Sequence, residues 1–181
     1  YNAEKKCWIL SFDRDITTIG KGAFRMCDRL TSVTIPDGVT TIGEGAFNEC
    51  KSLKTVNIPD GVTTIGKYAF KDCTSLININ LPDGISTIAM ETFFGCTSLK
   101  SITIPDSVTH IAYYAFQDCS VLQDVTMGNS VKTISNYAFD RCMALQEIII
   151  PESVTTMGYG AFRNCISLKA VYCHPSIPPV L

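Results

Sequence analysis

The sequence has little of the material that enzymes and nucleic-acid-binding proteins depend on. Its 181 residues include only two histidines, and its 15 basic and 17 acidic residues give a formal net charge of −2. No block of like charges is present to attract a phosphate backbone or an anionic lipid surface. No apolar run reaches the roughly 18 residues that a membrane-spanning helix needs. We therefore expect neither nucleic-acid binding nor membrane insertion.

Catalytic groupings are missing as well. Neither His110 nor His174 lies beside a Ser or Cys in a context that suggests an activated nucleophile, and we expect both side chains to face solvent. The glycines do not form a phosphate-binding loop. The sequence therefore predicts a protein that is not an enzyme, with no catalytic residues and no cofactor.

What the sequence does contain is an internal repeat with a 23-residue period. Seven units follow one another from residue 16 to residue 176 without insertion or deletion. They begin at Ile16, Val39, Val62, Ile85, Val108, Val131 and Val154. The ninth position is always phenylalanine and the twelfth always cysteine, from Phe24 and Cys27 to Phe162 and Cys165. Because one unit of this size cannot bury its own apolar face, we expect the units to stack into a solenoid with one core.

Every unit has the same local pattern, which residues 53–73 illustrate. The stretch 53–58, Leu-x-x-Val-x-Ile, ends in the period-two alternation of a short strand whose Val and Ile point inward. Pro-Asp-Gly at 59–61 predicts a turn in which glycine tolerates a positive φ. A second short β segment is expected at 62–66, and the Ala-Phe-x-x-Cys spacing within 67–73 predicts one helical turn facing the core.

The nine cysteines raise the question of a disulfide or metal framework, but seven of them occupy the same core column. Inward side chains on neighbouring parallel coils keep their Cβ atoms about 5 Å apart, beyond the usual disulfide separation of about 3.5–4.5 Å. No pair has the Cys-x-x-Cys spacing typical of zinc sites. We predict free thiols that fill the core.

A column of turn carboxylates is the best candidate for a metal site, because carboxylates one coil apart would offer hard oxygen ligands to Ca²⁺. The column consists of Asp37, Asp60, Asp83 and Asp106, and continues as Asn129 and Glu152. Pro-Asp-Gly is a turn signal that needs no metal, so the structural interpretation is favoured and no metal site is predicted.

Both ends continue the pattern in part. Residues 7–12 align with the strand of a preceding unit, so an eighth strand is expected ahead of the first repeat. Cys173 takes an inward strand position, and three prolines then interrupt the pattern. We expect one solenoid with a partial N-terminal coil (1–15), seven repeats (16–176) and a C-terminal tail (177–181), belonging to a longer protein.

The unit Leu-x-x-Val-x-Ile-Pro-Asp-Gly-Val-Thr-Thr-Ile-Gly-x-x-Ala-Phe-x-x-Cys resembles the BspA-like, or pallidum-type, leucine-rich repeat family over nearly the whole chain. Local departures from it are Gly128 for proline, Thr92 for alanine, and Ala89, Ala112 and Ser135 for glycine. The resemblance implies an α/β repeat, a right-handed leucine-rich-repeat solenoid with parallel β-sheet stacking. It also implies a secreted or cell-surface bacterial protein, often an adhesin, whose family has no catalytic residues.

Positions that vary while the scaffold stays constant are the candidates for binding a partner. Aromatic and methionine side chains gather just before the Ala-Phe pair, and tyrosine is enriched at binding hot spots. This aromatic strip consists of Tyr68, Met90, Phe94, Tyr113, Tyr114, Tyr137 and Tyr159. The alternative is that these rings merely cover the rim of the core. A second candidate is the polar outer face of the main sheet, with outward positions such as Lys54, Asn57, Ile149, Lys169 and Tyr172.

Two functions follow from this pattern. The first is a non-enzymatic protein–protein or adhesion module whose partner is a protein, such as a host or extracellular-matrix protein, or a glycan. The alternative is a structural repeat spacer that presents another domain and has no specific ligand of its own.

Overall fold

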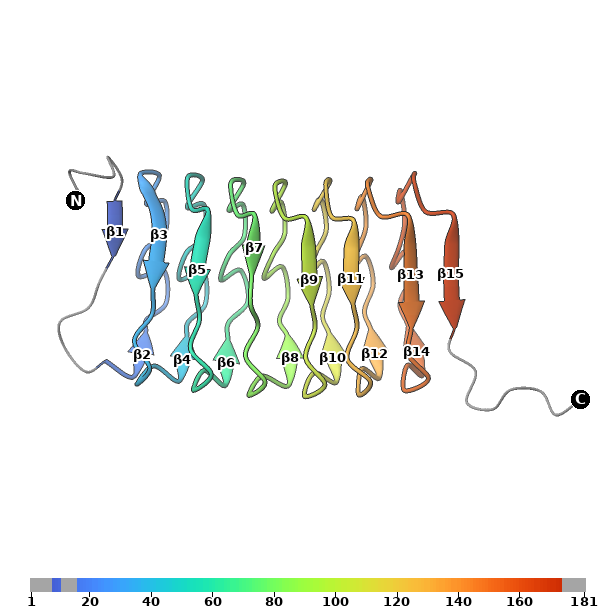
Figure 1. Cartoon of the computed structure of the whole chain (residues 1–181), viewed down its shortest axis with the longest axis horizontal. Coiled ribbons are helices and arrows are strands. Elements are labelled where there is room, and N and C mark those ends of the chain that lie inside the picture. Colours follow the sequence, from blue (N-terminus) through green and yellow to red (C-terminus); the bar gives the residue numbers. More distant parts are fainter. Residues whose placement is uncertain (1–7, 11–15, 174–181) are drawn as a thin grey trace, which may run out of the picture.

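A row of short parallel strands runs the length of the molecule, one strand for each coil (Figure 1). The computed structural model describes residues 8–10 and 16–173. The main row contains β1 (Trp8–Leu10), β3 (Leu30–Thr34), β5 (Thr55–Asn57), β7 (Asn78–Ile79), β9 (Ser101–Thr103), β11 (Asp124–Thr126), β13 (Glu147–Ile150) and β15 (Ala170–Cys173). β1 pairs with β3, so the strand expected ahead of the first repeat is present.

The pairing register of the main row is one repeat. Val33 lies opposite Val56, and Val56 lies opposite Ile79, so each inward side chain contacts its equivalent in the next coil. Hydrogen bonding joins the row as β1-β3-β5-β7, β9-β11 and β13-β15. The main row is therefore continuous in space but divided into three hydrogen-bonded groups.

A second row of two-residue strands forms another side of the stack. It contains β2 (Thr18–Ile19), β4 (Thr41–Ile42), β6 (Thr64–Ile65), β8 (Thr87–Ile88), β10 (His110–Ile111), β12 (Thr133–Ile134) and β14 (Thr156–Met157). These strands are also parallel, with Ile42 opposite Ile65. Two parallel rows that recur once in every coil confirm the predicted solenoid of about seven turns.

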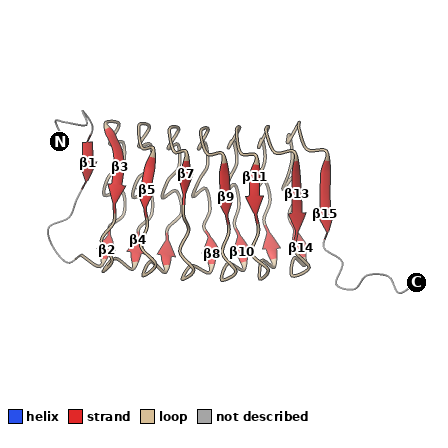
Figure 2. Cartoon of the chain, in the orientation of Figure 1, coloured by secondary structure: helices blue, strands red, loops and turns tan. Residues whose placement is uncertain are grey.

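The third side of each coil contains turns, and the expected helical turn is not confirmed. Among the described residues there is no helix (Figure 2). In the second coil the amides of Ala46, Asn48 and Cys50 each donate to the carbonyl three residues earlier, at 3.0–3.2 Å. Between these turns, the Phe47 amide donates to the Ala69 carbonyl of the next coil at 2.8 Å. A regular helix would use these amides within the coil, whereas here alternate amides join neighbouring coils.

Left-handed residues make this alternation of bonds geometrically feasible. The seventh and eleventh positions of every coil have φ between 52° and 69°, and ten of these residues are not glycine. The glycines of the Pro-Asp-Gly turns are not among them, so the prediction of a positive φ there was wrong. Those turns close instead with a bond such as that from the Val62 amide to the Pro59 carbonyl, 3.1 Å.

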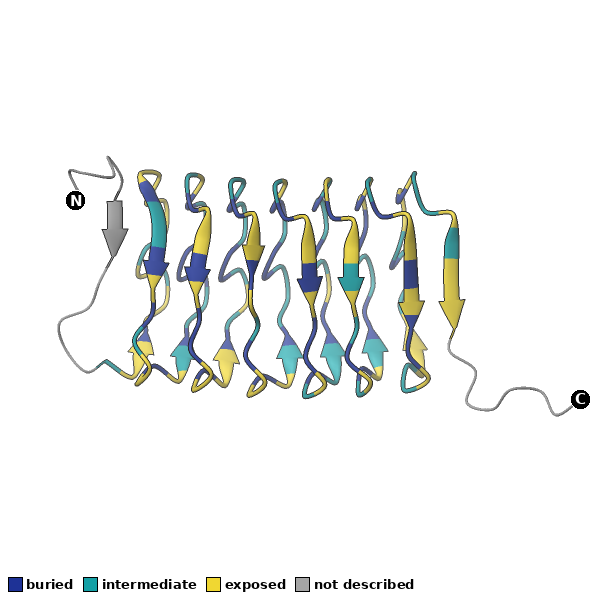
Figure 3. Cartoon of the chain, in the orientation of Figure 1, coloured by how far each residue is buried: buried dark blue, intermediate teal, exposed yellow. Residues whose placement is uncertain are grey.

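The core is a set of stacked columns enclosed by the three sides (Figure 3). The phenylalanine rings form a ladder from Phe24 to Phe162, with centroids 5.0–5.7 Å apart and planes within 15° of parallel. The five rings from Phe47 to Phe139 are fully buried. Stacking of equivalent side chains therefore supplies the burial that a single coil lacks.

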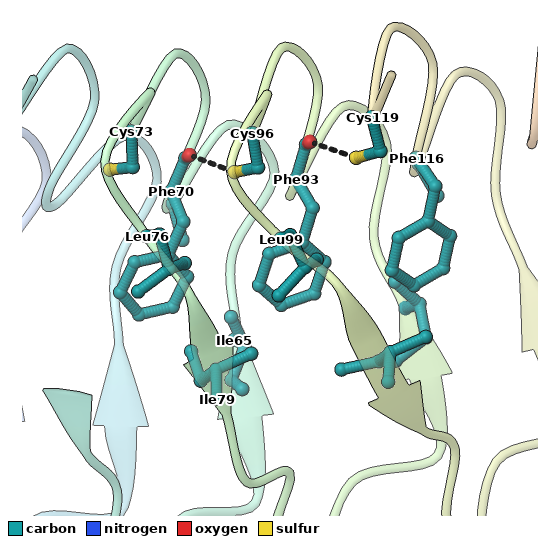
Figure 4. Packing of buried hydrophobic residues seen from close by; sticks show 14 of the residues in the cluster. Ile65, Phe70, Cys73, Leu76, Ile79, Phe93, Cys96, Leu99, Phe116 and Cys119 are labelled. Carbon is teal, nitrogen blue, oxygen red and sulfur yellow. Dashed lines mark hydrogen bonds between the residues drawn. The ribbon is translucent and has the colours of Figure 1, made fainter. Parts of the chain in front are cut away.

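The cysteine column makes a hydrogen-bonded ladder beside the phenylalanines (Figure 4). The Cys96 thiol donates to the Phe70 carbonyl of the preceding coil at 3.2 Å, and the Cys119 thiol donates to the Phe93 carbonyl at 3.1 Å. The eight described cysteines are all free. A thiol is small enough for the core and gives the Phe70 carbonyl a second donor beside the Cys73 amide, which alanine would not do.

Candidate binding surface

The aromatic strip lies on the turn side of the solenoid and is unevenly exposed. Tyr68, Tyr114 and Tyr137 occupy left-handed positions with φ of 58–61° and are half-buried. Tyr113 is 49% exposed and Tyr159 is 72% exposed. The backbone conformation therefore sets the direction of the Cα–Cβ bond of each tyrosine. Packing against the neighbouring coils determines how much of each ring is exposed.

The first part of the strip is occupied by internal contacts. The Lys71 ammonium group lies 5.7 Å from the ring centroid of Tyr68 and 4.5 Å from that of Phe94. The same group forms an ion pair with Glu91 at 2.5 Å. Cation–π contacts and a charge pair already satisfy these half-buried groups. The interpretation as a cover over the core rim fits Tyr68 and Phe94.

The second part of the strip is a continuous group, which we call the tyrosine cluster: Tyr114, Tyr137, Tyr159 and Arg163. The Tyr114 and Tyr137 rings are parallel, with centroids 5.4 Å apart and planes 2° from parallel. The Tyr159 ring meets Tyr137 edge-on at 5.5 Å, and the Arg163 guanidinium lies 4.7 Å from the Tyr137 centroid. Three successive coils thus contribute rings to one surface.

A buried carboxylate holds this cluster in place. The Asp140 side chain is fully buried, and Arg163 donates to it from Nε at 3.1 Å and from Nη2 at 2.9 Å. Gln117 and Asn164 add hydrogen bonds of 2.7 and 3.1 Å. Burial opposes ionisation of this carboxyl, but the bonds from Arg163 and Gln117 outweigh it and lower the pKa of Asp140. Arg163 is therefore fixed before any partner binds.

The remaining strip residues do not join either aromatic group. Met90 and Tyr113 contact the neighbouring coils through their backbone carbonyls, which accept from the Tyr68 and Glu91 amides at 3.0 and 3.1 Å. Neither Arg163 nor Asp140 was predicted from the sequence as part of a binding surface. A signal was available, because Asp140 is the only acid in the tenth position of the repeat, where Lys71 and Arg163 are basic.

Two of the residues considered for metal binding or catalysis contact the neighbouring coil. Within residues 8–10 and 16–173, no three His, Cys, Asp or Glu side chains are grouped to hold a metal ion. Asp106 instead accepts a hydrogen bond from the Asn129 amide, 2.7 Å. His110 was expected to face solvent, but it is half-buried and its Nε2 lies 3.2 Å from the Ser135 hydroxyl. His174 lies outside the described residues.

The comparison with protein families agrees with this geometry. The profile described as BspA type leucine-rich repeat region matches residues 2–121 and 63–179, with six copies. The chain belongs to the BspA-type leucine-rich repeat family. No protein with a curated description matches it. In the part of the chain that the structure describes, no helix has the length and apolar character to cross a membrane.

Solved structures of bacterial leucine-rich repeat proteins have the same fold. A T. pallidum leucine-rich repeat protein is 33% identical, with a TM-score of 0.84 over 91% of this chain and 78% of its own. A Bacteroides ovatus leucine-rich repeat protein is 36% identical, with a TM-score of 0.83 over 90% of this chain and 43% of its own. A leucine-rich cell-surface protein of Faecalibacterium prausnitzii is 37% identical, with a TM-score of 0.78 over 89% and 44%. The chain thus spans less than half the length of two of these relatives.

Proposed function

We propose that this chain is a protein-binding module of a bacterial cell-surface protein and that the tyrosine cluster is its contact surface. The observation that carries the proposal is the fixed group of three tyrosines and Arg163 on successive coils. Tyr and Arg are enriched among the residues that contribute most to binding, and the anchoring of Arg163 by Asp140 reduces the entropy lost on association. A cell-surface location is supported by the description of the F. prausnitzii relative.

Binding rather than catalysis suits the character of the surface. The cluster offers ring faces, hydroxyls and one cation, but no nucleophile activated by a neighbouring base. Leucine-rich repeat solenoids present extended surfaces whose shape follows from stacking, and these suit macromolecular partners. A host or extracellular-matrix protein is the proposed class of partner, and adhesion is the proposed role.

The proposal is tested by measuring affinities of the immobilised chain for a panel of purified matrix proteins, bacterial surface proteins and glycans. We expect at least one protein in the panel to bind. The double variant Tyr114→Ser/Tyr137→Ser should weaken that binding about tenfold or more, as expected for hot-spot residues. The matched control is Tyr68→Ser, which changes a tyrosine with the same backbone conformation outside the cluster and should leave the affinity unchanged.

The alternative function, a structural spacer, makes the opposite prediction in the same assay. A spacer binds no panel member specifically, and both tyrosine variants then behave like the wild-type chain. If Tyr68→Ser and the double variant lose binding equally, the tyrosine cluster is not the contact surface.

A further inference from the structure

One turn of the solenoid differs from the others in sequence and in its packing. Five turns contain proline where the fifth coil has Gly128. Gly128 is buried, and a Cβ atom at this position would lie 2.4 Å from the Pro105 carbonyl oxygen. The Asn129 amide also donates to the Asp106 carboxylate at 2.7 Å. The turn of the fifth coil therefore packs closely on the turn of the fourth, which only glycine allows.

On its other side, the fifth coil is not joined to the sixth along the main sheet. β11 pairs with β9, and β13 pairs with β15. No backbone hydrogen bond joins β11 to β13 in the described part of the chain. The inward residues Val125 and Met127 are only partly buried, whereas Ile102 of the preceding coil is 2% exposed. Figure 3 shows this difference between β9 and β11.

The separation leaves a hollow of about 540 Å³ between the two strands. Val125, Met127, Ile149 and Pro151 give it an apolar lining, and Glu152 is its charged residue. It opens on the outer face of the sheet, since Ile149 is an outward strand residue and 54% exposed. Its volume lies within the range of pockets that hold small molecules or large side chains.

The charges around the hollow indicate the chemistry of its occupant. A neighbouring depression on the same strands is lined by Asp124 and Glu147, together with Lys169. With Glu152 included, three carboxylates and a single ammonium group line the two depressions. Charge complementarity favours a cationic group beside the apolar side chain that fills the hollow.

We propose that the hollow between β11 and β13 receives a bulky apolar side chain of a protein partner, with a Lys or Arg of the same segment beside Glu152. The inference rests on the proposed role in protein binding but places a second contact on the outer face of the main sheet, separate from the tyrosine cluster.

Methyl NMR with two short probes tests the site directly. Acetyl-Trp-Lys-amide should shift the methyl resonances of Val125, Met127 and Ile149 in a saturable manner. Acetyl-Trp-Glu-amide should bind about threefold more weakly, the effect expected of an exposed charge pair. Absence of shifts at these methyl groups, or equal affinity for the two probes, would overturn the proposal. Shifts that depend on protein concentration alone would assign the hollow to a second copy of this chain and overturn it too.

Variants separate this site from the tyrosine cluster. Glu152→Lys should remove the preference for the Lys probe, whereas Asp60→Lys, which changes the equivalent turn acid of an earlier coil, should retain it. Gly128→Ala should weaken the Lys probe, because the added Cβ pushes the fifth turn off the fourth and into the hollow. Tyr114→Ser/Tyr137→Ser should leave probe binding unchanged. If that double variant abolishes it, the probe binds the tyrosine cluster and the proposed function survives without this second site.

Discussion

At the scale of single residues, the repeat is held together by positions where one coil closely approaches the next. Gly66 is an example, since an ideal Cβ there would lie 2.6 Å from the Glu44 amide nitrogen and 2.8 Å from the Gly43 carbonyl carbon. Both are backbone atoms, which cannot rotate away. Glycine at this position is therefore required by the stacking of the second and third coils and not by a left-handed φ.

This close approach predicts a position-dependent cost of adding one methyl group. Gly66→Ala should lower the free energy of unfolding by about 1–3 kcal/mol, the usual cost of overpacking. Gly20→Ala is the matched control, because no atom lies within 4 Å of its ideal Cβ, and its effect should be below about 0.5 kcal/mol. Urea unfolding of both variants measures the difference. Equal effects would show that the coils can separate at no cost.

The residue columns were predictable from the sequence, but the way each coil accommodates an exception was not. Ala89, Ala112 and Ser135 replace the same glycine in later coils, yet their turns close normally. The Ala115 amide, for example, donates to the Ala112 carbonyl at 3.3 Å. The atoms that a Cβ at this position meets belong to the preceding coil, as Gly43 and Glu44 do for Gly66. The pattern within one repeat therefore does not predict whether a Cβ fits.

At the scale of elements, period-two alternation correctly predicted the strands. The Ala-Phe-x-x-Cys spacing predicted a helical turn, and the structure has a series of tighter turns there. That spacing fits one helical turn and also fits successive turns with left-handed residues between them. Tyr68 and Asp72 adopt left-handed φ although neither is glycine, because bonds to the next coil compensate for the strain. Local propensity was outweighed by stacking.

The cysteine ladder predicts a loss of stability in alkali. Burial raises the pKa of Cys50 to about 12 and also raises the pKa values of Cys73, Cys96 and Cys119. Below about pH 8.5, the pKa of a cysteine in the unfolded chain, the thiols are protonated in both states and the fold keeps its full stability. As the pH rises from there toward the folded-state pKa, only the unfolded chain loses these protons, so the free energy of unfolding falls. Each of these thiols should contribute a slope of about 1.4 kcal/mol per pH unit in this range.

Unfolding in urea under reducing conditions between pH 7 and pH 10 checks this prediction. The free energy of unfolding should be steady up to about pH 8.5 and then fall by about 5 kcal/mol per pH unit for the four thiols together. Cys96→Ala should reduce the slope by about a quarter while costing some stability at neutral pH, since the Phe70 carbonyl loses a donor. A stability that does not change up to pH 10 would contradict the burial of the ladder.

At the scale of the whole molecule, all coils stack in the same register, but their side chains form different surfaces along the solenoid. Sequence variation placed tyrosines along most of the solenoid, and the structure separates them into a group packed around Lys71 and the tyrosine cluster, of which Tyr159 is the exposed member. The division depends on Lys71, Glu91, Asp140 and Arg163, whose side chains meet only after the coils stack. For this reason the sequence indicated the flank but not which part of it is free to bind.

The proposed contact surfaces both involve the sixth coil, which contributes Tyr137 to the tyrosine cluster and β13 to the hollow. The third coil contributes to neither. Removing either coil as a complete repeat unit preserves the register, so both shortened chains should remain folded solenoids with fewer stacking interfaces.

The most direct test compares the affinities of these two deletions for the panel protein that the full chain binds most tightly, after circular dichroism has verified that both fold. Deleting residues 62–84 should leave the dissociation constant within about threefold of the full chain, whereas deleting residues 131–153 should raise it about tenfold or more. Equal affinities of the two shortened chains, or a larger loss on deleting residues 62–84, would contradict the assignment of binding to the last three coils.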